Sequence, residues 1–117
     1  MLKDYKILCI PENNGHKRFL LGQRGTRELL AIGLNPSTAN EHKLDPTSRN
    51  IKTIAHKYDY DGWWVTNLYA LRTPKPELLP LKADVKLAKE NIDFIKNMLN
   101  NKSFNTSDVL LCWGNNV

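Results

Sequence analysis

Three short apolar runs, each followed by an asparagine, constrain the fold of this chain most strongly. The runs cover residues 29–34, 63–66 and 109–114. The residues that follow them are Asn35, Asn67 and Asn115. Short apolar runs bounded by turn residues and separated by helical patterns are typical of buried strands in a parallel sheet, where ligands bind outside the carboxyl ends. A carboxamide there offers a donor and an acceptor side by side, as the edge of a nucleobase requires.

Two amphipathic helical patterns separate the runs. The first begins at Asp45, an N-cap residue type, with Pro46 at the first helical position. The apolar spacing of this helix predicts a buried face formed by Ile51, Ile54, Ala55 and Tyr58. Asp84 can cap the second helix. The predicted buried stripe of that helix is Val85, Ala88, Ile92, Ile95 and Leu99.

The N-terminal part predicts an antiparallel hairpin, with strands at residues 5–10 and 17–22 around a turn at 11–16. The whole order predicts one α/β domain over residues 1–117, with a three-layer, mainly parallel sheet flanked by helices. The third apolar run should be a central strand, yet the sequence stops three residues after Gly114. We therefore expect the domain to lack its last helix and strand, and the uncovered strand to favour a homodimer.

Composition restricts the possible partners. The 117 residues carry a net charge of +5, with a pI of about 9.3, which favours DNA, RNA or a nucleotide, although the cationic residues are scattered. No apolar stretch has the length of a membrane span and no signal-peptide region begins the sequence, so we expect a cytoplasmic protein. Cys9 and Cys112 lie in predicted strands and should be reduced core residues. The histidines lack metal-ligand spacing, and no cofactor motif is present, so neither a metal nor a cofactor is predicted.

The first strand tip carries the first group of candidate site residues. Gly33 permits another group to approach the backbone, and Pro36 ends the strand ladder. Asn35 is then presented at the tip, where it can hold a water or a ligand amide. Ser37 and Thr38 can donate to an anion or simply cap the loop. The alternative is an ordinary strand-to-loop turn, in which Asn-Pro is common.

The second strand tip carries another group. Asn67 can pair with a base edge, Tyr69 can stack on its face, and Arg72 can bind a phosphate. The alternative places Tyr69 at the rim of the core and Arg72 in solvent. Two neighbouring tips that both carry asparagine favour a site.

The N-terminus of the first helix is a further candidate. The main role expected for Asp45 and Thr47 is to cap the helix. The same helix end could also bind phosphate, and Arg49 lies within its first turn.

Four blocks of the sequence resemble the bacterial and phage family known as domain of unknown function 1643. They are residues 27–39, ending in GLNPSTA, DPTSRNIKTIA at 45–55, TNLYALRTPKP at 66–76, and LLCWGNN at 110–116. The blocks cover most of the chain in the family's order. This resemblance implies membership but brings no established activity.

A more distant resemblance is to the uracil-DNA glycosylase superfamily, through residues 33–36, 65–67 and 111–114. It implies that Asn35 positions the attacking water, that Asn67 reads the base, and that Tyr69 substitutes for the stacking aromatic residue. The superfamily's histidine-containing motif would follow beyond this sequence, so we expect binding rather than N-glycosidic hydrolysis. Three functions stay open: a base-releasing hydrolase, a nucleotide or nucleic-acid binding module, and an α/β domain that only self-associates.

Overall fold

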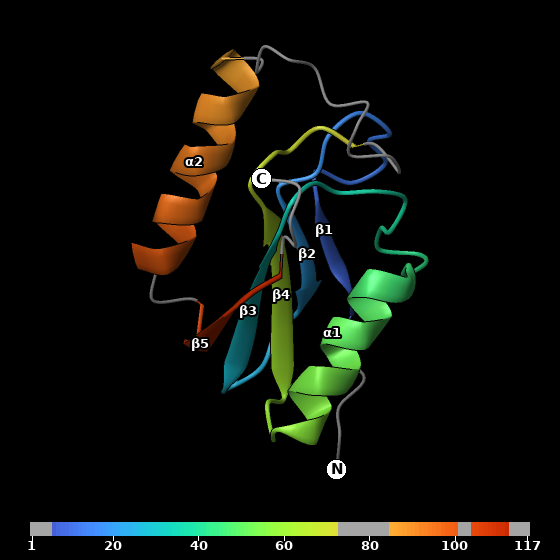
Figure 1. The fold of residues 1–117 in the computed structure, drawn as a ribbon, viewed down its shortest axis with the longest axis vertical. Helices are drawn as coiled ribbons and strands as arrows, with labels where there is room; N and C mark the ends of the chain where they lie inside the picture. Colours follow the sequence, from blue (N-terminus) through green and yellow to red (C-terminus); the bar gives the residue numbers. More distant parts are fainter. Residues whose placement is uncertain (1–5, 73–84, 101–103, 113–117) are drawn as a thin grey trace.

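The computed structural model describes residues 6–72, 85–100 and 104–112. Within these ranges the elements follow the predicted order (Figure 1). They are β1 (Leu8–Ile10), β2 (Leu20–Gln23), β3 (Glu28–Gly33), α1 (Pro46–Lys57), β4 (Gly62–Asn67), α2 (Val85–Asn100) and β5 (Thr106–Leu111). The predictions for Asp84 and Asn115 lie outside the described residues. In the described ranges, neither helix is both long and apolar enough to cross a membrane.

The strands form one mixed sheet in the order β1-β2-β4-β3-β5. Strand β3 pairs in parallel with both β4 and β5, which confirms the parallel arrangement of the three apolar runs. The predicted hairpin is also confirmed, since β1 pairs antiparallel with β2, and β2 pairs antiparallel with β4. Gly33 is the register partner of Asn67, so the two strand tips lie side by side.

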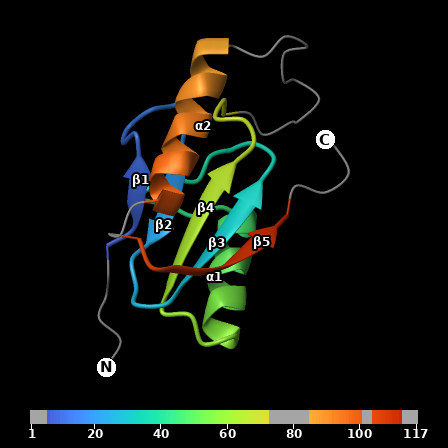
Figure 2. The ribbon, with the colours of Figure 1, turned by 90° about the vertical axis from the view of Figure 1, so that its left-hand side faces the viewer.

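The sheet lies between the two helices, as Figure 2 shows with α2 in front and α1 behind. Consecutive tryptophans of β4 serve the two faces: Trp63 packs in the cluster that contains Ile51 and Ala55 of α1, and Trp64 in the cluster with Met98 of α2. Both tryptophans are fully buried. The predicted three-layer arrangement is therefore present, because strand residues alternate between two separately covered faces.

Two predictions about the third apolar run are wrong. The strand covers Thr106–Leu111 rather than 109–114, and it lies at the edge of the described sheet rather than at its centre. The reason is topological: β4 takes the central place beside β2, so the crossover through α2 brings the chain to the far side of β3. The side chains of Val109 and Leu111 are consequently 49% and 60% exposed. Cys112 is exposed as well, whereas Cys9 is buried as predicted.

The helix faces also differ from the predicted ones. In α1, Ile51 and Ala55 are buried, but Ile54 and Tyr58 are exposed, and Tyr58 is the C-cap. In α2 the predicted stripe is wrong at three positions that are exposed, namely Val85, Ile92 and Leu99. The buried residues of α2 are instead Leu87, Asn91 and Met98, with Phe94 half-buried. This face is turned inward because Asn91 bonds the end of β4 and Met98 packs with Trp64.

Helix α1 begins where the sequence predicts. The Asp45 carboxylate accepts from the backbone N–H of Ser48 over 2.9 Å, and the Ser48 hydroxyl accepts from the backbone N–H of Asp45 over 3.0 Å. This reciprocal capping box satisfies donors that a helix start otherwise leaves unpaired, and Pro46 follows at the first helical position.

Candidate functional site

Three loops gather at the carboxyl ends of β3 and β4, at the top of Figure 1. They line an open cavity of about 350 Å³. Its lining residues come from the β1–β2 turn, the loop after β3 and the segment after β4; they are Asn13, Asn14, Gly15, Ser37, Thr38, Asn40 and Arg72. The sequence predicted Ser37, Thr38 and Arg72 as site residues, and the structure brings these three together. The Asn-Asn-Gly part was predicted only as a turn.

Two short segments hold the cationic side chains of this region. Residues 16–18, before β2, run antiparallel beside residues 70–72, after β4. The backbone N–H groups of Arg18 and Arg72 each donate to a carbonyl oxygen of the facing segment, over 2.9 and 2.8 Å. Residue 18 faces residue 70, so Arg18 and Arg72 are diagonal neighbours on one face of the pair.

The two guanidinium groups meet at one backbone oxygen. Arg18 Nη1 donates to the carbonyl oxygen of Ala39 over 3.1 Å, and Arg72 Nη1 donates to the same oxygen over 3.0 Å. Arg72 Nη1 also donates to the carbonyl oxygen of Ser37 over 2.7 Å, and Arg18 Nη2 donates to Asn67 Oδ1 over 3.3 Å. These bonds fix the loop after β3 against both arginines.

Positive charge at this point is poorly compensated. Arg18 is only 3% exposed, and in the described part of the chain neither arginine forms an ion pair. The Nε atoms of both are buried and find no partner among the described residues. Burial and the charge of Arg72 lower the pKa of Arg18 to about 10. The site therefore holds the buried guanidinium group of Arg18 beside the half-buried guanidinium group of Arg72.

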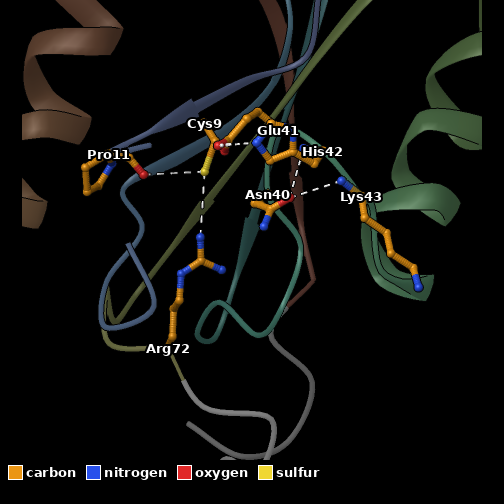
Figure 3. Close-up of polar contacts among 7 residues, drawn as sticks. All are labelled: Cys9, Pro11, Asn40, Glu41, His42, Lys43 and Arg72. Atoms are coloured by element: carbon orange, nitrogen blue, oxygen red, sulfur yellow. Dashed lines mark hydrogen bonds and ion pairs between the residues drawn. The ribbon is translucent and has the colours of Figure 1, made fainter. Parts of the chain in front are cut away.

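Cys9 and Glu41 lie beside Arg72 (Figure 3). The Cys9 thiol donates to the carbonyl oxygen of Pro11 and accepts from Arg72 Nη2, both over 3.7 Å. Burial raises the pKa of this thiol, so it stays neutral. A hydrogen bond from its own backbone N–H and the charge of His42 hold the pKa of Glu41 below its usual value. Glu41 Oε1 lies 3.3 Å from His42 Nε2, and Glu41 Oε2 is buried without a hydrogen-bond partner among the described residues. One carboxylate therefore lies beside two guanidinium groups, and the net charge of this cluster stays positive.

Asn67 is buried and connects β4 to three neighbours. Its Oδ1 accepts from Arg18, and its Nδ2 packs over Gly33, where an added Cβ would lie only 2.8 Å away. Gly33 therefore admits a close approach, as predicted, and the group that approaches is Asn67. On the opposite side Asn91 Nδ2 donates to the carbonyl oxygens of Asn67 and Leu68 over 2.8 and 3.3 Å. The sequence does not indicate the role of Asn91, because an asparagine within a helical pattern carries no signal of burial.

The remaining predicted residues of the strand tips have local roles. Asn35 is half-buried and donates through Nδ2 to the carbonyl oxygen of Pro36 over 3.0 Å, and Pro36 is itself buried. The backbone N–H of Tyr69 donates to the carbonyl oxygen of Leu34, and its ring is 42% exposed. The proposed catalytic role of Asn35 and the stacking role of Tyr69 stay predictions.

The predicted phosphate-binding residues divide between two places. Arg72 lines the cavity, whereas Asp45, Thr47 and Arg49 lie at the beginning of α1. Arg49 lines a second, more open hollow of about 490 Å³ and donates through Nη1 to the carbonyl oxygen of Leu44 over 2.8 Å. Asp45 is occupied by the capping box, and Thr47 is exposed.

The three histidines, His16, His42 and His56, are exposed. Over residues 6–72, 85–100 and 104–112, no group of three or more histidine, cysteine or acidic side chains is arranged to hold a metal ion. The chemistry that the described site offers is therefore that of arginine, amide and hydroxyl groups.

A family model described as "Protein of unknown function (DUF1643)" matches residues 18–117. No protein of curated function and no solved structure matches the chain. The match covers Arg18 and every residue of the cavity that comes from the loops after β3 and β4, whereas Asn13, Asn14 and Gly15 precede the matched range.

Proposed function

The chain belongs to the family of proteins of unknown function DUF1643, and for this member we propose a binding function: it holds a phosphate-bearing ligand, a nucleotide, at the carboxyl ends of β3 and β4. One observation carries the proposal. The buried Arg18 and the half-buried Arg72 lie side by side next to a polar cavity, and neither forms an ion pair within the described residues.

A bound anion would compensate the two positive charges of this arrangement. Burying an unpaired charge is unfavourable by several kcal/mol per ion in order of magnitude, and two adjacent like charges add to this cost. A phosphate group accepts bidentate hydrogen bonds from guanidinium groups and supplies the opposite charge. The hydroxyl groups of Ser37 and Thr38 are further donors at the wall of the same cavity.

The other wall residues favour a nucleotide over inorganic phosphate alone. Asn13, Asn14 and Asn40 line the cavity. The Oδ1 atoms of Asn14 and Asn40 accept from backbone N–H groups of their own turns, so these two residues would offer their Nδ2 donors to the acceptors of a nucleobase edge. A volume of about 350 Å³ is within the range of small-ligand sites. Asn67 would contribute through its bond to Arg18, and the exposed ring of Tyr69 would stack on a base.

We propose binding rather than bond cleavage for this chain. N-glycosidic hydrolysis needs a group that positions water and donors that stabilise the departing base. Asn35 would have the first role, but its amide donates to the carbonyl oxygen of Pro36, and the described lining residues include no carboxylate or histidine. Base release from a nucleotide or from DNA would contradict this part of the proposal.

The test is a calorimetric titration with nucleoside 5′-monophosphates, the corresponding nucleosides and inorganic phosphate. We expect the monophosphates to bind at least about tenfold more tightly than the nucleosides, since a charge-assisted phosphate contact contributes about 1.5–3 kcal/mol. Arg72→Gln should remove this preference. Lys96→Gln, which removes one positive charge from the exposed surface of α2, should retain it.

Because Arg72 also holds the loop after β3, Thr38→Val provides a second variant. Thr38 is exposed at the cavity wall, so loss of its hydroxyl should weaken phosphate binding a few-fold without unfolding the chain. Equal affinity for nucleoside and monophosphate in the unmodified protein would overturn the proposed function.

A further inference from the structure

The second hollow lies on the N-terminal part of α1 and is rich in cationic side chains. Its lining residues are His42, Lys43, Leu44, Arg49, Lys52 and Thr53. Three of the six carry a full positive charge at neutral pH, and the lining contains no acidic residue. The hollow is therefore electrostatically suited to an anion, although it is more open than the cavity beside Arg72.

One tight turn separates the two hollows. Asn40 lines the first, whereas His42 and Lys43 line the second. Asn40 Oδ1 accepts from the backbone N–H groups of His42 and Lys43 over 2.9 and 3.0 Å, and the Asn40 N–H donates to the Lys43 carbonyl oxygen over 2.9 Å. Figure 3 shows this turn with Arg72 on one side and the Lys43 side chain directed away on the other. The two hollows are thus consecutive along the surface.

The acidic groups near this turn contact groups other than the two lysines. Glu41 Oε1 lies 3.3 Å from His42 Nε2, and the Asp45 carboxylate accepts from the backbone N–H and the hydroxyl of Ser48. Lys43 and Lys52 form no ion pair within the residues that the structure describes. Two lysine charges at this hollow are therefore available to an external anion.

We propose that the hollow on α1 is a second phosphate subsite, and that the ligand is a single-stranded oligonucleotide rather than a mononucleotide. This inference rests on the proposed function of the first cavity. Two anion subsites on either side of one turn match a ligand whose phosphates repeat along a chain. Cationic grooves that follow the backbone are the usual means of binding single strands. A base that enters the cavity must be unpaired, which favours a single strand over a duplex.

The experiment compares a mononucleotide with a mixed-sequence single-stranded pentanucleotide by calorimetry at several salt concentrations. We expect the pentanucleotide to bind at least about tenfold more tightly. Its logarithmic salt slope should be steeper by about 0.7 for each added phosphate contact. The double variant Lys43→Gln/Lys52→Gln should reduce the ratio of the two affinities about tenfold. The control Lys86→Gln/Lys96→Gln, which removes two charges from the exposed surface of α2, should leave the ratio unchanged.

The outcomes separate the two proposals. If neither ligand binds, the proposed function itself is wrong. If the mononucleotide binds but the pentanucleotide binds no more tightly, or if both double variants change the ratio equally, only the second subsite is wrong. A nucleoside triphosphate that matches the pentanucleotide in affinity and in its dependence on the two lysines would also overturn the assignment to an oligonucleotide.

Discussion

Arg18 and Arg72 donate to the same backbone oxygen, the carbonyl of Ala39, over 3.1 and 3.0 Å. Arg18 precedes β2 and Arg72 follows β4, and because these two strands are antiparallel, both arginines lie at the same end of the sheet. The loop after β3 supplies the shared acceptor. This convergence places two guanidinium groups together at the carboxyl end of the parallel strands, and it is the basis of the proposed anion site.

Replacement of Arg18 should weaken ligand binding strongly but change the free energy of unfolding only slightly. Arg18→Met removes a charge that burial and Arg72 both disfavour, but it also removes two hydrogen bonds. Because these effects oppose each other, we expect the free energy of unfolding to change by less than about 2 kcal/mol. Affinity for a nucleoside monophosphate should fall at least tenfold. Urea unfolding and calorimetry measure the two quantities; unchanged affinity would contradict the role of Arg18.

Gly33 should tolerate no side chain without displacement of Asn67. In Gly33→Ala the new Cβ would meet Asn67 Nδ2 at 2.8 Å, and Asn67 is only 4% exposed. We expect a loss of about 1–3 kcal/mol in the free energy of unfolding, which is typical of overpacking. The Asn67 side-chain amide signal should also shift in NMR spectra. The matched control is Gly15→Ala, since an added Cβ at Gly15 meets nothing within 4 Å. Equal stability of the two variants would show that the contact is relaxed at no cost.

Asn91 should be essential to the attachment of α2. Asn91→Asp replaces an amide donor by a carboxylate that faces two carbonyl oxygens at the end of β4. We expect a loss of about 3 kcal/mol or more, because the change leaves a buried charge and two unpaired acceptors. Asn97→Asp, on the exposed side of the same helix, should have an effect below about 0.5 kcal/mol. Similar urea midpoints for the two variants would argue against the buried placement of Asn91.

Asp61 should contribute a pH-dependent part of the stability. Hydrogen bonds from the backbone N–H groups of Arg27 and Thr26, and then from the Thr26 hydroxyl, lower the pKa of Asp61 to about 2. Because the pKa of Asp61 in the folded state lies below the ordinary value of 3.8, the ionised carboxylate stabilises the fold above pH 3.8. This stabilisation disappears as the pH falls toward 2. Asp61→Asn should therefore cost about 1 kcal/mol near pH 6 and little near pH 2. Urea unfolding at several pH values tests this, with the exposed Asp59→Asn as control; a cost for Asp61→Asn that is independent of pH would contradict it.

The order of the elements was predictable from the sequence because it depends on local signals. The capping residues Asp45 and Pro46, the apolar run of β3 and the turn before β2 each act over a few neighbours. The inward face of α2 was not predictable in this way. Its apolar side chains Val85, Ile92 and Leu99 have the correct helical spacing, but Asn91 is buried in their place. A hydrogen bond to the end of a distant strand determined the rotation of the helix, and no local pattern records such a bond.

The candidate site was predictable only in part for the same reason. Arg72, Ser37 and Thr38 follow strand ends, and parallel pairing alone brings strand ends together. Arg18 precedes a strand, and the chain bends at Phe19 before β2 begins, so alternation along the strand does not reveal the direction of its side chain. Its burial depends on Asn67 and on the carbonyl oxygen of Ala39, which lie 49 and 21 positions away in the sequence.

The most direct test of the anion site is the thermal midpoint of the unmodified protein in phosphate and in chloride at equal ionic strength. A ligand at a hundred times its Kd adds about 2.7 kcal/mol to the free energy of unfolding. For a domain of this size, that corresponds to a rise of about 10 °C in Tm. We expect a saturable rise in phosphate that is absent in chloride and absent in the double variant Arg18→Met/Arg72→Gln. Equal midpoints in the two salts, or the same rise in the double variant, would contradict the account.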